Sequence, residues 1–222
     1  MQRTSRAGRL AAVVIAAATT ALAVAGPAQA TETHTATAQT VSNRATTNHA
    51  ASQRVSAQWA STPSNYYLYI DGQAQEQSNW CWAATGNSVA AYFGYDYSQN
   101  QFCDMAFGYS TNVTCPNDQA TLGNDQQAFS TIGINPGRYI SGTISYSTLV
   151  DQISNNEPVM TRIGWTSGGG HMMVLTGYDQ SNSQVQYYDP WPSDSRFNVS
   201  TYDWYRSNSQ FTWTHTLYGI GA

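Results

Sequence analysis

The 222-residue chain is acidic and poor in charge, with 9 basic and 13 acidic residues and a formal net charge of −4. All nine basic residues are arginines, and three of them lie in the first 30 residues, so a chain without that segment keeps six basic against thirteen acidic residues. Nucleic acids and anionic membranes both require a basic surface on their partner. We therefore expect neither of them as a partner.

Residues 1–30 have the layout of a secretory signal peptide. Arg3, Arg6 and Arg9 precede an apolar run over residues 10–24, and Ala-Gln-Ala at 28–30 has the small residues of a cleavage site. The run is too short and too rich in alanine for a membrane-spanning helix. We predict cleavage after residue 30, export to the extracellular space and no membrane partner for the mature protein.

Two composition classes divide the remainder of the chain. Residues 31–57 are rich in Thr, Ala, Gln and Ser and contain no aromatic residue. They cannot bury enough apolar surface to fold alone, which indicates a low-complexity spacer or a pro-segment. Aromatic residues begin at Trp59 and continue to the end of the chain, so residues 58–222 are predicted to form one domain of ordinary size.

Residues 75–93 predict a short loop followed by a helix that begins at Cys81. Ser78 or Asn79 is the expected N-cap, and Gly94 is the expected stop. At this end of a helix the macrodipole and the unpaired N–H groups favour thiolate over thiol. We therefore expect a nucleophilic Cys81. The alternative is an inert cysteine that packs as a small hydrophobe or forms half of a disulfide.

A glutamine upstream of Cys81 is the candidate oxyanion donor. Gln75 lies six residues before Cys81, close enough on a folded-back loop for its amide to converge with the Cys81 backbone N–H. Two converging donors beside a nucleophile make an oxyanion hole. Gln77 also precedes the cysteine and competes for this role.

The cysteine count is odd for an exported protein. Cys103 and Cys115 flank a segment rich in Gly, Ser, Thr and Asn, and a disulfide between them would close a surface loop and leave Cys81 free. Spacing alone leaves the other pairings open. The three cysteines and the histidines lack the spacing of a zinc site, so we expect no metal.

Further elements follow from periodicity and turn residues. A second helix is expected over residues 122–132, ending at Gly133, and a third over 147–155 with Ser147 at its start. Strands are expected at four places, namely residues 158–165, 171–178, 184–188 and 211–218. Helices followed by an antiparallel sheet predict an α+β fold.

The candidate base is His171. It opens a strand directly after the glycine run 168–170, which lets backbone or substrate approach closely. Asp189 ends a later strand and is a candidate to accept the imidazole N–H and fix its tautomer. His215 lies within the last strand and is expected to be structural, whereas His34 and His49 lie in the low-complexity segment and are poor candidates.

These residues together resemble the papain-like cysteine peptidases. The similarity is carried by Gln75-x5-Cys81-Trp-Ala-Ala, by Gly-Gly-His171 and by Tyr-Tyr-Asp189-Pro-Trp, and it covers roughly residues 66–190. It is greatest to a compact bacterial branch that contains secreted effector proteases of plant pathogens and the peptidases that cut leader peptides after a double glycine. The residue that follows the cysteine and the histidine in this motif set is Asp189, where plant and lysosomal enzymes have Asn. The substrate rules of those enzymes therefore do not carry over.

The resemblance implies a papain-like fold in which a helical lobe carrying the nucleophile packs on an antiparallel β-sheet lobe. It assigns Cys81 as nucleophile, His171 as base, Asp189 as orienting acid and Gln75 as oxyanion donor. Four tryptophans are expected to wall the cleft: Trp80, Trp82, Trp165 and Trp191.

The function expected from this sequence is that of a secreted, monomeric cysteine endopeptidase, which acts on protein or peptide substrates without metal or cofactor. The same triad supports other acyl transfers, so a peptidoglycan hydrolase and a transglutaminase-like enzyme are alternatives. The third alternative is a non-catalytic secreted binding domain in which Cys81 is buried or disulfide-bonded.

Overall fold

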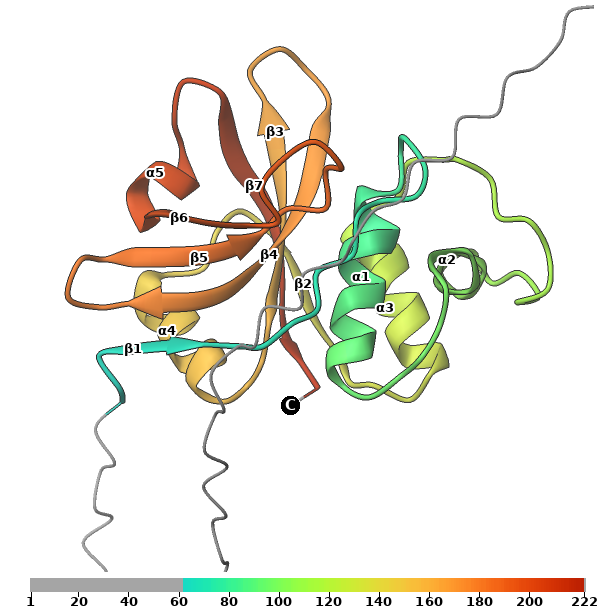
Figure 1. Ribbon diagram of the computed structural model, residues 1–222, viewed down its shortest axis with the longest axis horizontal. Helices are drawn as coiled ribbons and strands as arrows, with labels where there is room; N and C mark the ends of the chain where they lie inside the picture. Colours follow the sequence, from blue (N-terminus) through green and yellow to red (C-terminus); the bar gives the residue numbers. More distant parts are fainter. Residues whose placement is uncertain (1–61, 222) are drawn as a thin grey trace, which may run out of the picture. The chain divides into compact units, whose positions relative to one another are not determined.

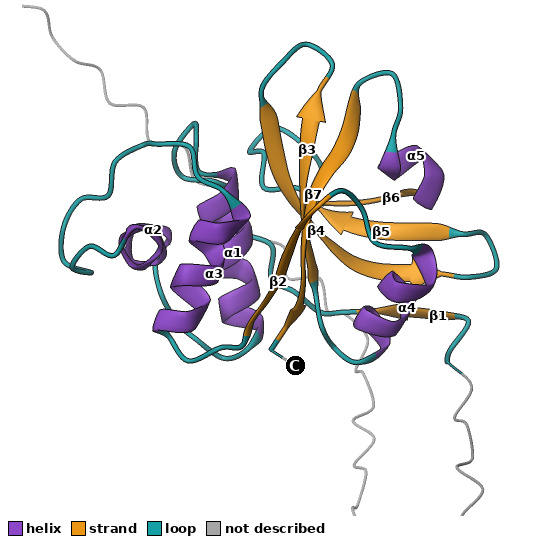
Figure 2. Ribbon diagram, turned by 180° about the vertical axis from the view of Figure 1, so that it is seen from behind, coloured by secondary structure: helices purple, strands orange, loops and turns teal. Residues whose placement is uncertain are grey.

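A computed structural model describes residues 62–221 (Figure 1). The predicted signal peptide and spacer, together with His34 and His49, lie outside the described residues. Within the described part, three helices stand on one side, and an antiparallel sheet with two further helices stands on the other (Figures 1 and 2). The predicted α+β class is confirmed.

Three helices form the helical lobe: α1 (Cys81–Tyr92), α2 (Gln99–Phe107) and α3 (Leu122–Thr131). In α1, every residue from Trp82 to Ala90 is buried, so the helix lies inside the protein rather than presenting one apolar face. The helix ends where predicted, because Gly94 adopts a φ of 90°, a conformation that glycine tolerates best.

Two details of this lobe differ from the sequence prediction. The N-cap of α1 is Trp80, with no side-chain cap, because Ser78 and Asn79 are both hydrogen-bonded to Asn117. Helix α2 was not predicted, although Ser98 and Gln101 form a capping box at its start. Cys103 therefore lies in a helix and not at the edge of a loop.

The sheet contains seven strands in the order β2-β7-β3-β4-β5-β6, and β1 pairs with β4. Their bounds are β1 (Asn65–Tyr67), β2 (Pro136–Ser141), β3 (Val159–Trp165), β4 (Gly170–Asp179), β5 (Gln184–Tyr188), β6 (Phe197–Thr201) and β7 (Phe211–Ile220). Every pairing is antiparallel. The four predicted strands are β3, β4, β5 and β7, whereas β1, β2 and β6 were missed.

Two helices pack on the sheet lobe, α4 (Tyr146–Ser154) and α5 (Tyr202–Arg206). The prediction included α4 but placed its start at Ser147, whereas Ser145 is the N-cap that accepts from the Thr148 N–H. The short α5 was not predicted. None of the helices in residues 62–221 combines the length and hydropathy needed to cross a membrane.

The tyrosine at the end of β5 joins the two lobes. Tyr188 is buried, and its hydroxyl donates to the Gln73 carbonyl. The same oxygen accepts from Ser88 Oγ of α1 at 3.2 Å, and that Ser88 oxygen accepts from the Gln73 N–H at 3.1 Å. This network fixes α1 against the end of β5, one residue before Asp189.

Replacing Tyr188 with phenylalanine should therefore weaken the attachment of the lobes. The Gln73 carbonyl loses its donor in a buried place, which should lower the free energy of unfolding by about 1–3 kcal/mol. Chemical denaturation measures the change, with Tyr69→Phe as the control because Tyr69 is 98% exposed. Equal stability of the two variants would show that the hydroxyl network contributes nothing.

Candidate active site

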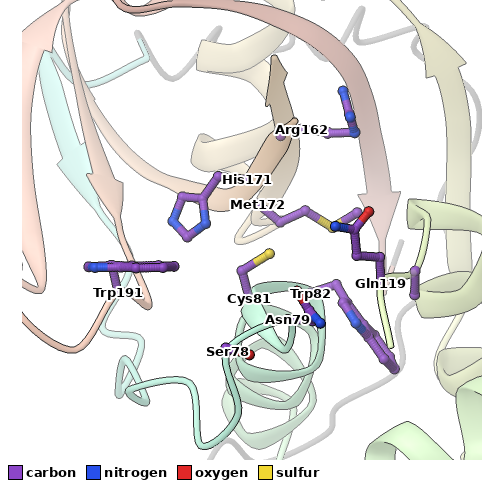
Figure 3. Close-up of a pocket in the computed structure, with 11 residues that line it drawn as sticks. Ser78, Asn79, Cys81, Trp82, Gln119, Arg162, His171, Met172 and Trp191 are labelled. Carbon is purple, nitrogen blue, oxygen red and sulfur yellow. The ribbon is translucent and has the colours of Figure 1, made fainter. Parts of the chain in front are cut away.

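Three separate elements bring the candidate catalytic residues together. Cys81 is the first residue of α1, His171 is the second residue of β4, and Asp189 directly follows β5. Cys81 and His171 line one cavity where the helical lobe faces the sheet, and their side chains point toward each other (Figure 3). The structure thus places the sequence-predicted cysteine, histidine and aspartate in one site.

The imidazole of His171 is held by Asp189. Its Nε2 lies 2.8 Å from Asp189 Oδ1, and both residues are buried. The carboxylate is fixed in turn, because Oδ1 also accepts from the Trp191 backbone N–H at 2.9 Å. Arg196 donates from Nη1 to the Asp189 carbonyl at 2.6 Å. With Nε2 engaged, Nδ1 is the nitrogen available to Cys81.

The surroundings of His171 favour its charged form. Burial alone lowers its pKa, but hydrogen bonds to Asp189 and Cys81 and the negative charges of both partners outweigh burial and raise the pKa to about 9. Because the protonated form persists below that value, His171 is an imidazolium through neutral pH. It can therefore stabilise a thiolate opposite it.

The position of Cys81 suits a nucleophile. It is a free cysteine and partly exposed. The first-turn N–H groups of a helix have no intrahelical acceptor, and here no side chain caps them and no acidic residue lies in the first turn. The positive end of α1 is thus directed at the sulfur.

A buried carboxyl lies beneath α1 on the side of α3. Asp125 is fully buried, and neither of its oxygens has a hydrogen-bond partner. Burial, and secondarily the negative charge of Cys81, raises its pKa well above the usual range. A protonated Asp125 places no second negative charge below the nucleophile.

Aromatic rings enclose the imidazole. Trp165 stacks on His171 with ring centroids 6.1 Å apart, and Trp191 meets it edge-on at 5.8 Å. Both tryptophans also line the cleft, as does Trp82, whereas Trp80 is buried in the core and lines none of these cavities. Three of the four predicted cleft tryptophans therefore lie at the site, and the expectation for Trp80 was wrong.

The wall opposite the sheet is a loop that several bonds hold in place. Cys103 and Cys115 form a disulfide, which is the pairing that the sequence favoured. Immediately after it, the indole N–H of Trp80 donates to the Pro116 carbonyl, and that of Trp82 donates to the Asp118 carbonyl, both at 3.0 Å. These anchors position residues 119 and 120, which line the cavity beside Cys81.

Gln75 lies outside this cavity in the structure. Its side chain is buried, and its amide nitrogen donates to the Gln77 carbonyl at 2.9 Å and to the Ser78 carbonyl at 3.0 Å. Its backbone N–H donates to the Pro190 carbonyl at 2.9 Å. Gln75 thus ties the loop before α1 to the segment that follows Asp189. Gln77, the competing donor, has an exposed side chain.

Sequence reasoning missed other residues of the site. Gln119, Arg162 and Met172 line the cavity with Cys81 (Figure 3). Arg162 carried a usable signal, because it is the one charged residue in the predicted strand 158–165. Gln119 carried none, since its place depends on the disulfide and the two indoles.

His215 lines none of these cavities, as expected. Its Nδ1 lies 3.0 Å from Thr214 Oγ1, and its ring packs on Tyr139. Among residues 62–221, no group of three or more His, Cys, Asp or Glu side chains is arranged to hold a metal ion.

A protein-family model described as papain-like cysteine protease AvrRpt2 matches residues 63–210 of the chain. The match covers two thirds of the sequence, so the chain belongs to this family of papain-like cysteine proteases. The resemblance stated from the sequence is confirmed, and the protein is a cysteine-type peptidase. No curated protein matches the chain.

Solved structures of peptidases are similar to the chain at low identity. The peptidase domain of Streptococcus ComA, a bi-functional ABC transporter involved in quorum sensing, shares 22% identity with a TM-score of 0.49 and covers 69% of this chain and 97% of its own. A double-glycine-motif protease from an AMS/PCAT transporter, in complex with the leader peptide, shares 16% identity with a TM-score of 0.48 and covers 71% of this chain and 95% of its own. Xylellain, a cysteine protease from Xylella fastidiosa, shares 10% identity with a TM-score of 0.44 and covers 71% of this chain and 87% of its own.

The pKa of His171 provides a direct check of this geometry. In protein labelled with ¹³C-histidine, its imidazole should titrate at about pH 9 by NMR. Replacing Asp189 with asparagine removes the carboxylate that stabilises the imidazolium, so the titration should move to lower pH. Protonation of His171 would then be lost at a lower pH than in the wild type. An unchanged titration in that variant would contradict the role assigned to Asp189.

Proposed function

We propose that this protein is a secreted cysteine endopeptidase that cuts peptide bonds with a Cys81–His171–Asp189 triad. The observation that carries the proposal is the free cysteine at the start of α1, facing an imidazole whose other nitrogen is hydrogen-bonded to a buried carboxylate. This arrangement supplies the nucleophile, the base and the group that orients the base.

The reaction follows from the positions of these groups. The Cys81 thiolate attacks the peptide carbonyl carbon, and the carbonyl electrons move to oxygen. When the tetrahedral intermediate collapses, the C–N bond breaks and the His171 imidazolium gives its proton to the leaving amine. Neutral His171 then takes a proton from water, whose hydroxyl attacks the thioester and releases the acid with Cys81 restored as thiolate.

The oxyanion forms at the positive end of α1. The Cys81 backbone N–H is one donor, because it belongs to the uncapped first turn. We assign Gln75 as the second donor. Its amide lies in the loop that leads into α1 and turns from the Ser78 carbonyl to the oxyanion as negative charge develops there. Catalytic hydrogen bonds often reach their final geometry only in the reacting complex.

Export and the oligomeric state belong to the same proposal. The signal-like layout of residues 1–30 and the Cys103–Cys115 disulfide both suit an oxidising compartment outside the cell. One chain contains the nucleophile, the base and the carboxylate, so the peptidase needs no second copy to complete its triad. Its substrates are proteins or peptides.

Hydrolysis of unfolded casein by the mature chain tests the function. Cys81→Ala and His171→Ala should each lower kcat/KM by at least about 10³-fold, since the triad acts as a unit. His215→Ala is the matched control, because it removes a histidine that lies outside the cleft, and it should keep most of the activity. Full activity of Cys81→Ala would refute the proposal. Activity on peptidoglycan or on glutamine–amine pairs instead of casein would replace it with another acyl transfer.

A second prediction concerns Gln75. If its amide donates to the oxyanion, Gln75→Ala should lower kcat about 10²-fold or more and change KM little. The melting temperature, measured in parallel, separates this effect from loosening of the loop. A lower melting temperature with unchanged kcat would show that Gln75 only holds the loop before α1.

A further inference from the structure

Arg162 places a positive charge in the cavity of the nucleophile. It lies on β3 beside β4, is partly buried and lines the cavity that contains Cys81. In the close-up view the guanidinium lies above Met172 and Gln119, on the side of Cys81 away from Trp191 (Figure 3).

The guanidinium is held in this position by its neighbours. Arg162 Nη1 donates to Thr214 Oγ1 at 3.1 Å, and the Thr214 hydroxyl donates back to the Arg162 carbonyl at 2.9 Å. The group also lies against Gly170, where a Cβ would come within 2.5 Å of Nη2 and 2.6 Å of Cζ. Glycine at position 170 therefore leaves the space that the guanidinium occupies.

This charge has no carboxylate partner within the described chain. The ion pairs of residues 62–221 are His171–Asp189 and Arg206–Asp203, and neither involves Arg162. A guanidinium has five N–H donors, and in this part of the chain only the bond to Thr214 uses one. His215 is a neighbour of Arg162, but a histidine carries no negative charge that could pair with the guanidinium. Arg162 thus presents unused donors and an unpaired charge at the cavity.

The position of the base indicates on which side of Cys81 each part of the substrate lies. His171 protonates the leaving amine, so the leaving part of the substrate lies on the side of His171 and Trp191. The acyl part then extends to the other side of Cys81, along Gln119, Met172 and Arg162 (Figure 3).

We propose that Arg162 selects substrates with a glutamate or aspartate side chain among the three residues that precede the scissile bond. A carboxylate there receives charge-assisted hydrogen bonds from a guanidinium that is already positioned. A substrate with a neutral side chain binds less well, because it leaves the charge of Arg162 unpaired. The inference rests on the proposed peptidase function, whose acyl side it describes.

Paired peptides test the assignment. Quenched peptides that carry either Glu or Gln at one of the three positions are compared by kcat/KM. At one position the wild type should prefer Glu by about tenfold or more, which corresponds to about 1.4 kcal/mol. Arg162→Gln should abolish the preference, and Arg162→Lys should keep part of it because the charge remains. Arg138→Gln is the matched control, since Arg138 is exposed on β2 and its loss changes the net charge equally.

A second measurement does not need turnover. The same Glu and Gln sequences are made as chloromethyl ketones, and their rates of Cys81 alkylation are followed by mass spectrometry. Faster alkylation by the Glu compound in the wild type, lost in Arg162→Gln, supports the assignment even if the peptides are not hydrolysed, which would count against the proposed function alone. Equal rates for Glu and Gln at all three positions, or a Glu preference that survives in Arg162→Gln, overturns it.

Discussion

The attachment of α1 to the ends of β4 and β5 is the constraint on which the site depends. A free cysteine often packs as a small buried hydrophobe, whereas Cys81 is partly exposed at a helix start and faces the imidazole that the sheet holds opposite it. The Tyr188 hydroxyl network fixes α1 one residue before Asp189, and the antiparallel pairing of β4 with β5 brings His171 and Asp189 to 2.8 Å. The Tyr188 network and the pairing of β4 with β5 therefore together fix the positions of Cys81, His171 and Asp189.

Electrostatics then divides the cavity into distinct parts. The imidazole, enclosed by Trp165 and Trp191, is buried and ion-paired, so it stays protonated where a free histidine would be neutral. The positive end of α1 faces the reacting carbonyl without competition from a side-chain cap. Arg162 adds a separate positive charge on the side of Cys81 away from Trp191. We propose that the first two features serve the reaction and that the third selects the peptide.

Much of this architecture could be predicted from local signals in the sequence. The stop of α1 at Gly94, the helix before Gly133 and the strands β3, β4, β5 and β7 all follow from periodicity and turn residues. What could not be predicted depends on distant partners. Ser78 and Asn79 are not caps because Asn117, far along the chain, binds both. The three-residue strand β1 exists only through its pairing with β4, and the position of Arg162 becomes meaningful only beside Gly170.

The measurement that tests the central claim most directly is the pH dependence of Cys81 alkylation by iodoacetamide, without reductant, on the mature protein. If Cys81 faces a protonated His171, it should be the sole cysteine modified, and it should react much more slowly near neutral pH in His171→Ala. Casein hydrolysis should disappear in proportion to the label. A Cys81 that is inert, disulfide-linked, or equally reactive without His171 would contradict the account.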